Sequence, residues 1–563
     1  MTQRAWWALA AGVAALALAA SANSTANGFT YDDIYVIPRA AERMGSLTGW
    51  WREFAQTYWL SETGGAGDGY RPLTILAFKL QWLAGGGSPF AFHAVNVGIH
   101  ALTAVAVLWL ASAVLPPAAA VIAAALYAVH PVHTEAIANV VGQSELAVAL
   151  LITIAAGIYL YARRAGPVTA SQWVTIALLY AAACFFKEHA IVLPALLVAA
   201  ECTVVIDRAP LRARLVQLRL PILILVVVAL GYLLVRTQVV EGVSGFVPAV
   251  PFQTLKLITG NRILTMIGAA PEWLRLLLWP ARLMTDYAPP YIDMAEGPSL
   301  VQLPGALLLI GVLGLIAACW RRSPMTSFGI LWLALTLLPS SNFIIPAGIL
   351  LAERTLLLPS VGAMLALASA VPWLYERLEP RRGLRLAAAG ALVLLIGLGI
   401  ARSSSRNRDW KDNDTLFHSG VADVPNNYRL HYLLANHLFE TGRVAQSEVH
   451  YREALRLFPY DPILPFMLAE RYRARGICEP AIQLYRWAFE LGPYLRYGET
   501  GLAGCLMEGM QLEEARTAAL NALRFGARYR PARQILEAVD AGMDSLAMRR
   551  ARADSSLPVT APR

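Results

Sequence analysis

Long apolar segments recur along most of this chain, and they constrain its fold more than any other feature. Of the 563 residues, 57% are hydrophobic and 15% are charged, a composition that excludes an ordinary soluble globule. A helix needs about 20 apolar residues to cross a bilayer, and about eleven segments reach that length with their flanks. They lie near residues 5–20, 90–115, 118–129, 146–161, 173–186, 191–206, 221–235, 303–320, 328–338, 355–375 and 386–400.

We therefore predict an all-α fold, in which a polytopic transmembrane helical domain of about eleven spans precedes a soluble domain. With a cytoplasmic amino terminus, Arg163, Arg164 and the arginines of residues 208–219 fall inside, as the positive-inside rule requires. The net charge of +9 is explained by such anchoring loops, so no nucleic-acid partner is implied. An odd number of spans places the carboxyl-terminal part outside, although the basic stretch 402–411 opposes this topology.

Two segments need separate interpretation. The first apolar run ends in Ala20-Ser21-Ala22, which resembles a signal-peptide cleavage site, but we predict that the run is retained as the first helix. In either case Asp32 and Asp33 lie on the outer side. Residues 255–280 carry Lys256, Arg262, Glu272 and Arg275, too much charge for a lipid-facing span, and are predicted to form an interfacial or re-entrant element.

A repeat with a spacing of 34 residues begins after residue 409. Pro425, Pro459 and Pro493 are in register, as are Gly442 with Gly476, Tyr451 with Tyr485, and Ala454 with Ala488. This period is typical of tetratricopeptide repeats, which stack helix pairs into a solenoid. A third, degenerate repeat contains Ala503, Ala515 and Ala522. Such stacks usually hold an extended peptide, and an assembly platform is the alternative.

The five cysteines do not have the spacing of a metal site, and we predict neither a zinc site nor a disulfide framework. The composition and the repeat together suggest the following division of the chain. It comprises a first transmembrane helix (1–27), an extracytoplasmic loop (28–89), a transmembrane domain (90–401), a linker (402–427), the repeats (428–550) and a disordered tail (551–563).

Two adjacent carboxylates, Asp32 and Asp33, follow the first helix in the string YDDIYVI. A membrane protein must solvate or pair acidic side chains at the edge of the bilayer, so such groups are often functional. A solvated turn is the alternative. Other polar side chains recur at the outer ends of predicted helices: Arg71, His130, His133, Glu135, Lys187, Glu188, Glu353 and Arg354.

Two chemistries fit these polar groups. His130, His133 and Glu135 could bind a divalent metal, but helix capping explains them as well and no further ligand is evident, so we assign no metal site. A base beside cations at membrane depth instead suits sugar transfer from a polyprenyl phosphate. Asp32 or Asp33 would accept the proton of the acceptor hydroxyl, and Arg354, Arg71 and Lys187 would stabilise the departing phosphate.

Several strings carry a family resemblance: YDDIYVI, LYAVHPVHTEAIANVVGQSEL, KEHAIVL, AERTLLLPSVG and RNRDWKDNDTLFHSG, followed by the repeats. They resemble the transmembrane and tetratricopeptide-repeat O-mannosyltransferases. The resemblance implies a glycosyltransferase fold of the GT-C type and a role in protein O-mannosylation from a lipid-linked mannose. It places site residues at Asp32 and Asp33, in the HPVHTE block and at Glu353 and Arg354. The family often has KEQ at Lys187-Glu188-His189 and a longer repeat array.

We therefore expect an inverting glycosyltransferase that transfers a sugar, mannose by resemblance, from a polyprenyl phosphate to Ser or Thr of exported proteins. The alternatives are a transferase acting on a glycan or lipid, and a catalytically silent membrane scaffold. The expected location is the bacterial inner membrane, with the site and the repeats on the periplasmic side, or the endoplasmic reticulum membrane in a eukaryote. The sequence leaves open the sugar, the carrier, the acceptor, the oligomeric state and which aspartate is the base.

Overall fold

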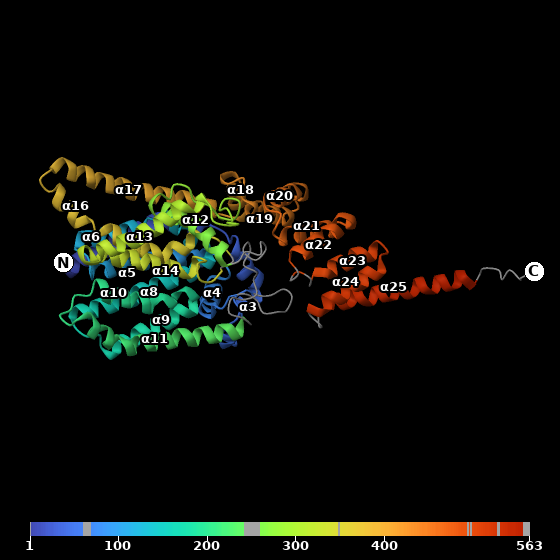
Figure 1. Ribbon diagram of the computed structural model, residues 1–563, viewed down its shortest axis with the longest axis horizontal. Coiled ribbons are helices and arrows are strands. Elements are labelled where there is room, and N and C mark those ends of the chain that lie inside the picture. The colour runs from blue at the N-terminus through green and yellow to red at the C-terminus, as the bar shows by residue number, and fades with distance from the viewer. Residues whose placement is uncertain are drawn as a thin grey trace, which may run out of the picture. The chain divides into compact units, whose positions relative to one another are not determined.

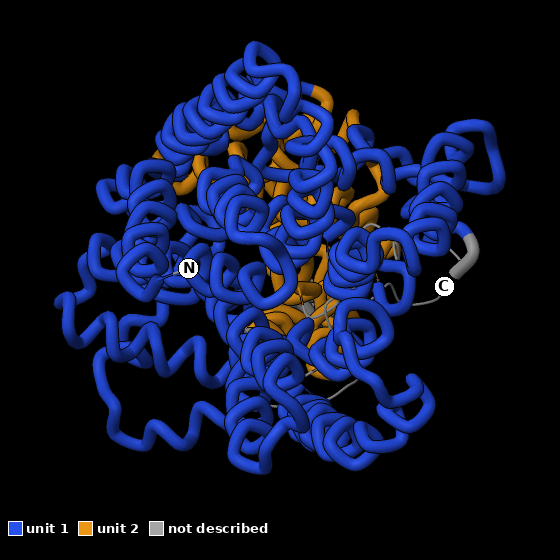
Figure 2. Tube along the Cα trace, turned by 90° about the vertical axis from the view of Figure 1, so that its left-hand side faces the viewer, with its two compact units in different colours: residues 1–249, 257–425 blue, residues 250–256, 426–563 orange. Residues whose placement is uncertain are grey.

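The computed structural model describes residues 2–59, 69–240, 259–346, 349–492, 495, 498–525 and 530–555. Within these ranges every regular element is a helix, which confirms the predicted all-α class (Figure 1). The chain divides into two compact units, a first unit that ends at Pro425 and a second unit that begins at Asn426 (Figure 2).

The first unit contains the apolar helices, with 3-10 helices, written η, at many of their ends. Its elements are α1 (Gln3–Ser21), η1 (Ala22–Ala26), α2 (Asp32–Val36), η2 (Pro38–Ala40), α3 (Ala41–Met44), η3 (Trp50–Ala55), α4 (Pro72–Gly85), α5 (Pro89–Ser112), α6 (Pro117–Ala128), η4 (Pro131–His133), α7 (Thr134–Ala138), η5 (Val140–Gly142), α8 (Gln143–Ala165), α9 (Ala170–Phe186), η6 (Glu188–Val192), α10 (Leu193–Thr203), α11 (Leu211–Val239), α12 (Thr259–Leu278), η7 (Leu300–Gln302), α13 (Leu303–Arg322), α14 (Pro324–Leu337), η8 (Leu338–Ser340), η9 (Glu353–Leu356), α15 (Leu357–Ala368), α16 (Val371–Leu378), α17 (Arg382–Asp409) and α18 (Asn413–Asp423).

Among the described residues, seven helical stretches are long and apolar enough to cross a membrane. The pair α6 and η4–α7, bent by 46° at the break, makes an eighth if it is counted as one span. The seven are Gln3–Ala26, Pro89–Ser112, Val140–Ala165, Leu211–Val239, Leu300–Arg322, Glu353–Leu378 and Arg382–Asp409.

This number differs from the eleven spans expected from composition, and helix length is the reason. Helix α9 has 17 residues, α10 has 11, and the α14–η8 stretch Pro324–Ser340 is also short, whereas a perpendicular crossing takes about 20 residues. The eleven predicted spans were identified from runs of apolar residues, and such runs do not show where a helix ends. Helix α12 is not among the candidate spans, as its charges led us to expect, and residues 255–258 of that predicted element lie outside the described residues.

Helices α14 and α15 approach each other closely because each presents a glycine to the other. A Cβ atom added to Gly329 would lie 2.5 Å from the carbonyl oxygen of Gly362 and 2.6 Å from the backbone nitrogen of Ala366. Next to this crossing, the fully buried Trp332 donates from its indole nitrogen to the carbonyl oxygen of Leu358, 3.0 Å away. Helix α15 continues directly from η9, which carries two of the predicted site residues.

The residues between the first two spans pack against α5 and η5 rather than forming an open loop. Ile37, Phe78 and Phe92 are fully buried together with Val140, which begins η5. Residues 402–425 of the predicted linker likewise belong to the first unit, in which α17 continues to Asp409 and α18 follows after three residues.

The second unit consists of antiparallel helix pairs followed by one long helix. Its elements are α19 (Tyr428–Glu440), α20 (Val444–Leu457), α21 (Ile463–Arg473), α22 (Cys478–Leu491), α23 (Glu499–Glu508), α24 (Leu512–Phe525) and α25 (Arg530–Ser555). Helix α25 extends past residue 551, where we expected a disordered tail, and residues 556–563 lie outside the described residues.

The helix pairs follow the 34-residue period of the sequence. Tyr451 and Tyr485 occupy equivalent positions and are both fully buried. The turn inside each pair contains a residue with positive φ, at Gly442 (80°), Gly476 (69°) and Met510 (59°). The degenerate third repeat therefore keeps the backbone of the first two although it has lost the glycine. Pro493, which the register also included, lies outside the described residues.

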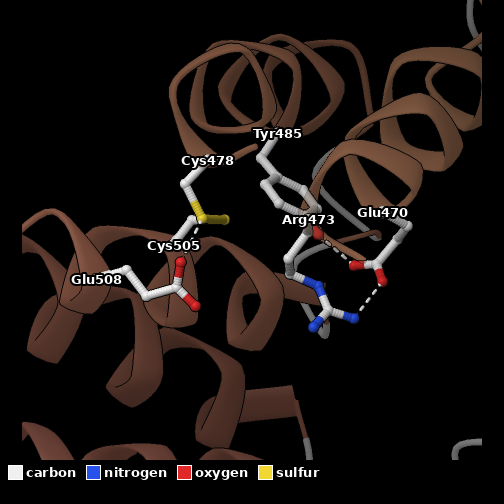
Figure 3. The surroundings of a disulfide bond; sticks show 6 residues. All are labelled: Glu470, Arg473, Cys478, Tyr485, Cys505 and Glu508. Carbon is white, nitrogen blue, oxygen red and sulfur yellow. Dashed lines mark hydrogen bonds and ion pairs between the residues drawn. A yellow bond between two sulfur atoms is a disulfide. The ribbon is translucent and has the colours of Figure 1, made fainter. Parts of the chain in front are cut away.

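A disulfide joins Cys478 at the start of α22 to Cys505 in α23, with Cα atoms 5.1 Å apart (Figure 3). The prediction of no disulfide framework was therefore wrong for this pair. The two cysteines are 27 residues apart in the chain, and only the stacking of consecutive helix pairs brings them together. Beside the disulfide, Arg473 donates to the carboxylate of Glu470 over 2.7 Å, and the Tyr485 hydroxyl donates to the same carboxylate.

Candidate active site

Asp33 is an anchor for the backbone around it. Its carboxylate is fully buried and accepts hydrogen bonds from the backbone nitrogens of Thr30 (3.3 Å), Val140 (3.1 Å) and Val141 (2.8 Å). Burial raises the pKa of Asp33 to about 7, although these three hydrogen bonds oppose the shift. The side chain therefore ties the start of α2 to η5, and it is not accessible to a substrate.

Asp32 faces a different environment. Its side chain is 25% exposed, and its Oδ2 lies 3.9 Å from the guanidinium Nη2 of Arg354. Glu135 holds that arginine, since its Oε2 accepts from the Arg354 backbone nitrogen over 2.8 Å and its Oε1 pairs with the guanidinium. Glu135 is on α7, directly after the break that follows α6, and Arg354 is on η9. The bend thus brings a carboxylate from one span to a cation at the start of another.

Lys187 lies between α9 and η6, and its ammonium pairs with Glu145 in the first turn of α8. The Nε2 atom of His189 is 3.1 Å from the other oxygen of Glu145. Burial lowers the pKa of Lys187, Glu145 raises it, and the charges of Arg71 and Arg354 lower it further. Lys187 therefore lies near both of the other cations predicted to bind phosphate.

Arg71 completes this cluster from the loop that precedes α4. Its Nη2 atom lies 3.4 Å from Oε1 of Glu188, and its guanidinium stacks 4.9 Å from the centre of the Tyr58 ring. The hydroxyl of Tyr58 and the Nε of Arg71 are buried without a hydrogen-bond partner among the described residues. Unpartnered buried donors are costly, so these two atoms make this part of the structure less stable than a fully hydrogen-bonded one. We use the name outer polar cluster for the partially exposed Asp32, the three cations Arg354, Arg71 and Lys187, and their carboxylate partners Glu135, Glu188 and Glu145.

Three predicted site residues are engaged in packing. The buried carboxylate of Glu353 accepts from the backbone nitrogen of Met284 (2.6 Å) and the Tyr287 hydroxyl (2.7 Å). His130 donates from Nε2 to the Leu277 carbonyl oxygen over 3.0 Å, and the Nε2 of His133 is 2.8 Å from the Ser360 hydroxyl. These bonds fix loops and helices against one another. His130 also caps η4, because its Nδ1 accepts from the Val132 backbone nitrogen over 3.3 Å.

A metal site does not emerge from the HPVHTE block. Within the described ranges, no group of three or more His, Cys, Asp and Glu side chains is arranged to hold a metal ion. The buried Glu135 contacts Arg354, and the two histidines contact neutral groups.

Sequence reasoning missed Tyr58, Glu145 and His189 as members of this neighbourhood. Glu145 carried a usable signal, because it is a carboxylate at the start of an apolar span and such a charge needs a partner. Tyr58 carried none, since an aromatic residue in a polar loop is unremarkable until Arg71 is found against its ring.

A cavity of about 490 Å³ lies elsewhere in the first unit, between α12 and residues 291–302. Its lining includes Glu272 and Tyr291, whose hydroxyl donates to Glu272 over 3.0 Å, and contains none of the predicted site residues. Its position gives no reason to connect it with the outer polar cluster.

Comparison with known proteins gives a consistent result. No family model matches the chain. The sequence is 27% identical over 463 residues to protein O-mannosyl-transferase TMTC3 of Mus musculus, covering 77% of this chain and 49% of that protein. It is 29% identical to Tmtc1 of Drosophila melanogaster, covering 79% and 60%, and 28% identical to human TMTC4, covering 78% and 65%. The chain spans about half the length of the first of these curated relatives. The chain is therefore similar in sequence to the TMTC O-mannosyltransferases, the resemblance that its motifs indicated.

Proposed function

We propose that the chain is a membrane-embedded glycosyltransferase that transfers a sugar, by homology mannose, from a polyprenyl phosphate to Ser or Thr hydroxyls of exported proteins. One observation carries the proposal. A partly exposed carboxylate, Asp32, lies 3.9 Å from the partly buried cation of Arg354, near the ends of candidate membrane spans. This geometry supports the proposal of a base next to a phosphate-binding group, near the ends of spans where a lipid headgroup would lie.

The proposed step is an inverting displacement at the anomeric carbon. The acceptor oxygen forms a bond to this carbon from the face opposite the phosphate, while the carbon–oxygen bond to the phosphate breaks. The hydroxyl proton moves to Asp32, and the bond electrons leave with the phosphate. General-base catalysis of this kind contributes roughly 10²–10⁴ in rate. We assign the base to Asp32 alone, because the Asp33 carboxylate is fully buried and accepts three backbone hydrogen bonds.

Arg354, Arg71 and Lys187 would hold the phosphate whose negative charge grows as the sugar departs. Each pairs with a carboxylate, Glu135, Glu188 or Glu145 respectively. These partners offset the cost of keeping cations at membrane depth and fix the position of each side chain. The donor atoms that these carboxylates do not engage remain for the phosphate.

The disulfide of the second unit supports the proposed location. Disulfides persist in oxidising compartments, which include the bacterial periplasm and the lumen of the endoplasmic reticulum. Cys478–Cys505 therefore favours an extracytoplasmic second unit, the side that we assign to Asp32. We propose that the helix pairs of this unit bind the acceptor polypeptide, since stacked helical repeats form extended binding surfaces.

The test is transfer of radiolabelled mannose from polyprenyl phosphate mannose to exported proteins in membranes that contain the full chain. Asp32→Asn is expected to reduce transfer by about 10²-fold or more at unchanged protein level, because it removes the base and keeps the shape. Arg354→Lys should also reduce transfer, since lysine cannot offer the planar fork of arginine. Normal transfer by Asp32→Asn would dismiss the assignment of the base. Label recovered in lipid or glycan instead of protein would support the alternative acceptor class.

A further inference from the structure

The backbone immediately before Asp32 has a conformation that L-residues rarely adopt. Tyr31 has φ 52° and ψ −119°, and the backbone nitrogen of Asp33 donates to the carbonyl oxygen of Thr30 over 3.0 Å. These are the features of a type II′ turn with Tyr31 at the position that normally requires glycine. A tyrosine persists there only where the surroundings hold it, and such strain is concentrated at functional sites.

The surroundings that hold Tyr31 come from the start of α18. The backbone nitrogen of Tyr31 donates to Oδ1 of Asn413 over 2.7 Å, and the ring of Tyr31 packs edge-on against Phe417 with centroids 6.2 Å apart. Three residues earlier, the nitrogen of Gly28 donates to the carbonyl oxygen of Lys411 over 2.8 Å. Asn413 is itself fixed, because it is the first residue of α18 and the preceding Asp412 caps that helix at Thr415, 2.8 Å away.

We propose that Asn413 is a positioning residue, which keeps Tyr31 in its left-handed conformation and thereby directs Asp32 at Arg354. The inference rests on the proposed function of Asp32. Asp33 is fixed by three backbone hydrogen bonds, so relaxation of Tyr31 toward negative φ cannot move it freely. The rotation is instead taken up by the peptide between Tyr31 and Asp33, which carries the Asp32 side chain.

The experiment measures mannose transfer at varied donor concentration by four variants of the full chain in membranes. Asn413→Ala is expected to lower kcat by about 10- to 100-fold with the KM for the donor changed less than about threefold, because misplacement of a reacting group by about 1 Å has effects of this size. Asn413→Asp retains an acceptor oxygen and should keep most of the activity. Asn23→Ala is the matched control, since Asn23 in η1 donates to the Ser404 carbonyl oxygen of α17 over 2.8 Å, also a bond between an asparagine side chain and the backbone, which lies away from Tyr31.

The fourth variant, Tyr31→Gly combined with Asn413→Ala, separates positioning from general stability. Glycine adopts this conformation without strain, so the kcat of the double variant should be at least about tenfold higher than the kcat of Asn413→Ala alone. A purely structural role for Asn413 predicts no such rescue, and that result would overturn the proposal. So would wild-type kcat in Asn413→Ala.

Hydrogen exchange of the segment 28–36 provides a readout that does not depend on sugar transfer. Asn413→Ala should raise exchange at the Tyr31 amide, and Asn23→Ala should not. If the wild-type chain transferred no sugar, the proposed function would fail while exchange still reported whether Asn413 holds the turn. Unchanged exchange in Asn413→Ala would overturn the proposal in either case.

Discussion

The crossing of α14 and α15 makes a sharp prediction about Gly329→Ala. The new methyl carbon would lie 2.5 Å from the Gly362 carbonyl oxygen, about 0.9 Å inside the 3.4 Å at which ordinary contact begins. The obstacle is helix backbone, which cannot rotate away as a side chain can. The two helices must therefore separate by a large fraction of that distance, which loosens the fully buried Trp332 and its hydrogen bond to Leu358.

Overpacking of a close-packed interior costs about 1–3 kcal/mol, and a rigid backbone contact belongs at the upper end. The helix preference of alanine over glycine returns about 1 kcal/mol. A net destabilisation of about 2 kcal/mol is expected. Because α15 continues from η9, the displacement should also move Arg354 relative to Asp32 and reduce sugar transfer.

The assay is thermal unfolding of the purified full chain in detergent, with mannose transfer measured on the same preparations. Gly314→Ala in α13 is the matched control, since nothing lies within 4 Å of its added Cβ, and it should be neutral or slightly stabilising. A Gly329→Ala protein that unfolds at the wild-type temperature would refute the reasoning from the backbone contact.

Three further predictions concern stability. Met510→Gly should stabilise the chain by about 0.5–1 kcal/mol in chemical unfolding, because Met510 has φ 59° in the turn where the other repeats have glycine; Gly476→Ala should have the opposite effect. Burial raises the pKa of Asp33 to about 7 from an ordinary value of 3.8, so the folded state binds the proton more tightly than the unfolded state does. The stability of the chain should therefore fall as pH rises from about 4 to about 7, by at most about 1.4 kcal/mol per pH unit. Thermal unfolding measured across this pH range should show no such slope in Asp33→Asn. Cys478→Ser combined with Cys505→Ser should destabilise the second unit by about 3 kcal/mol, measured by denaturant unfolding of the full chain with and without reductant, and a reductant-insensitive wild type would contradict it.

The sequence predicted the composition of the outer polar cluster better than the role of each residue. Asp32 and Arg354 were expected to meet because a base and a phosphate-binding cation serve one reaction, and they lie 3.9 Å apart. The difference between Asp32 and Asp33 could not be predicted. It is set by the backbone nitrogens of Val140 and Val141, and every residue type has a backbone nitrogen, so these partners leave no mark in the sequence.

The helical repeats show a similar limit. The period of 34 residues was visible because Tyr451 and Tyr485 fill equivalent buried positions, and side-chain identity reports packing. The third repeat was harder to recognise because Met510 replaces the glycine while the backbone keeps the same turn. The two cysteines of the disulfide meet only because consecutive helix pairs stack on one another, and the spacing of cysteines in the sequence does not reveal this stacking.

The way Asp32 and Asp33 are held bears on when, during synthesis, the site comes into existence. Asp33 needs the backbone of Val140 and Val141, and Tyr31 needs Asn413, whereas a nascent chain is made and inserted from its amino terminus. A ribosome that has passed residue 33 has made both aspartates but none of these partners. The proposed site is therefore assembled only after the last apolar helix has been inserted and α18 has folded back, so chains truncated before residue 413 should be membrane-integrated and silent.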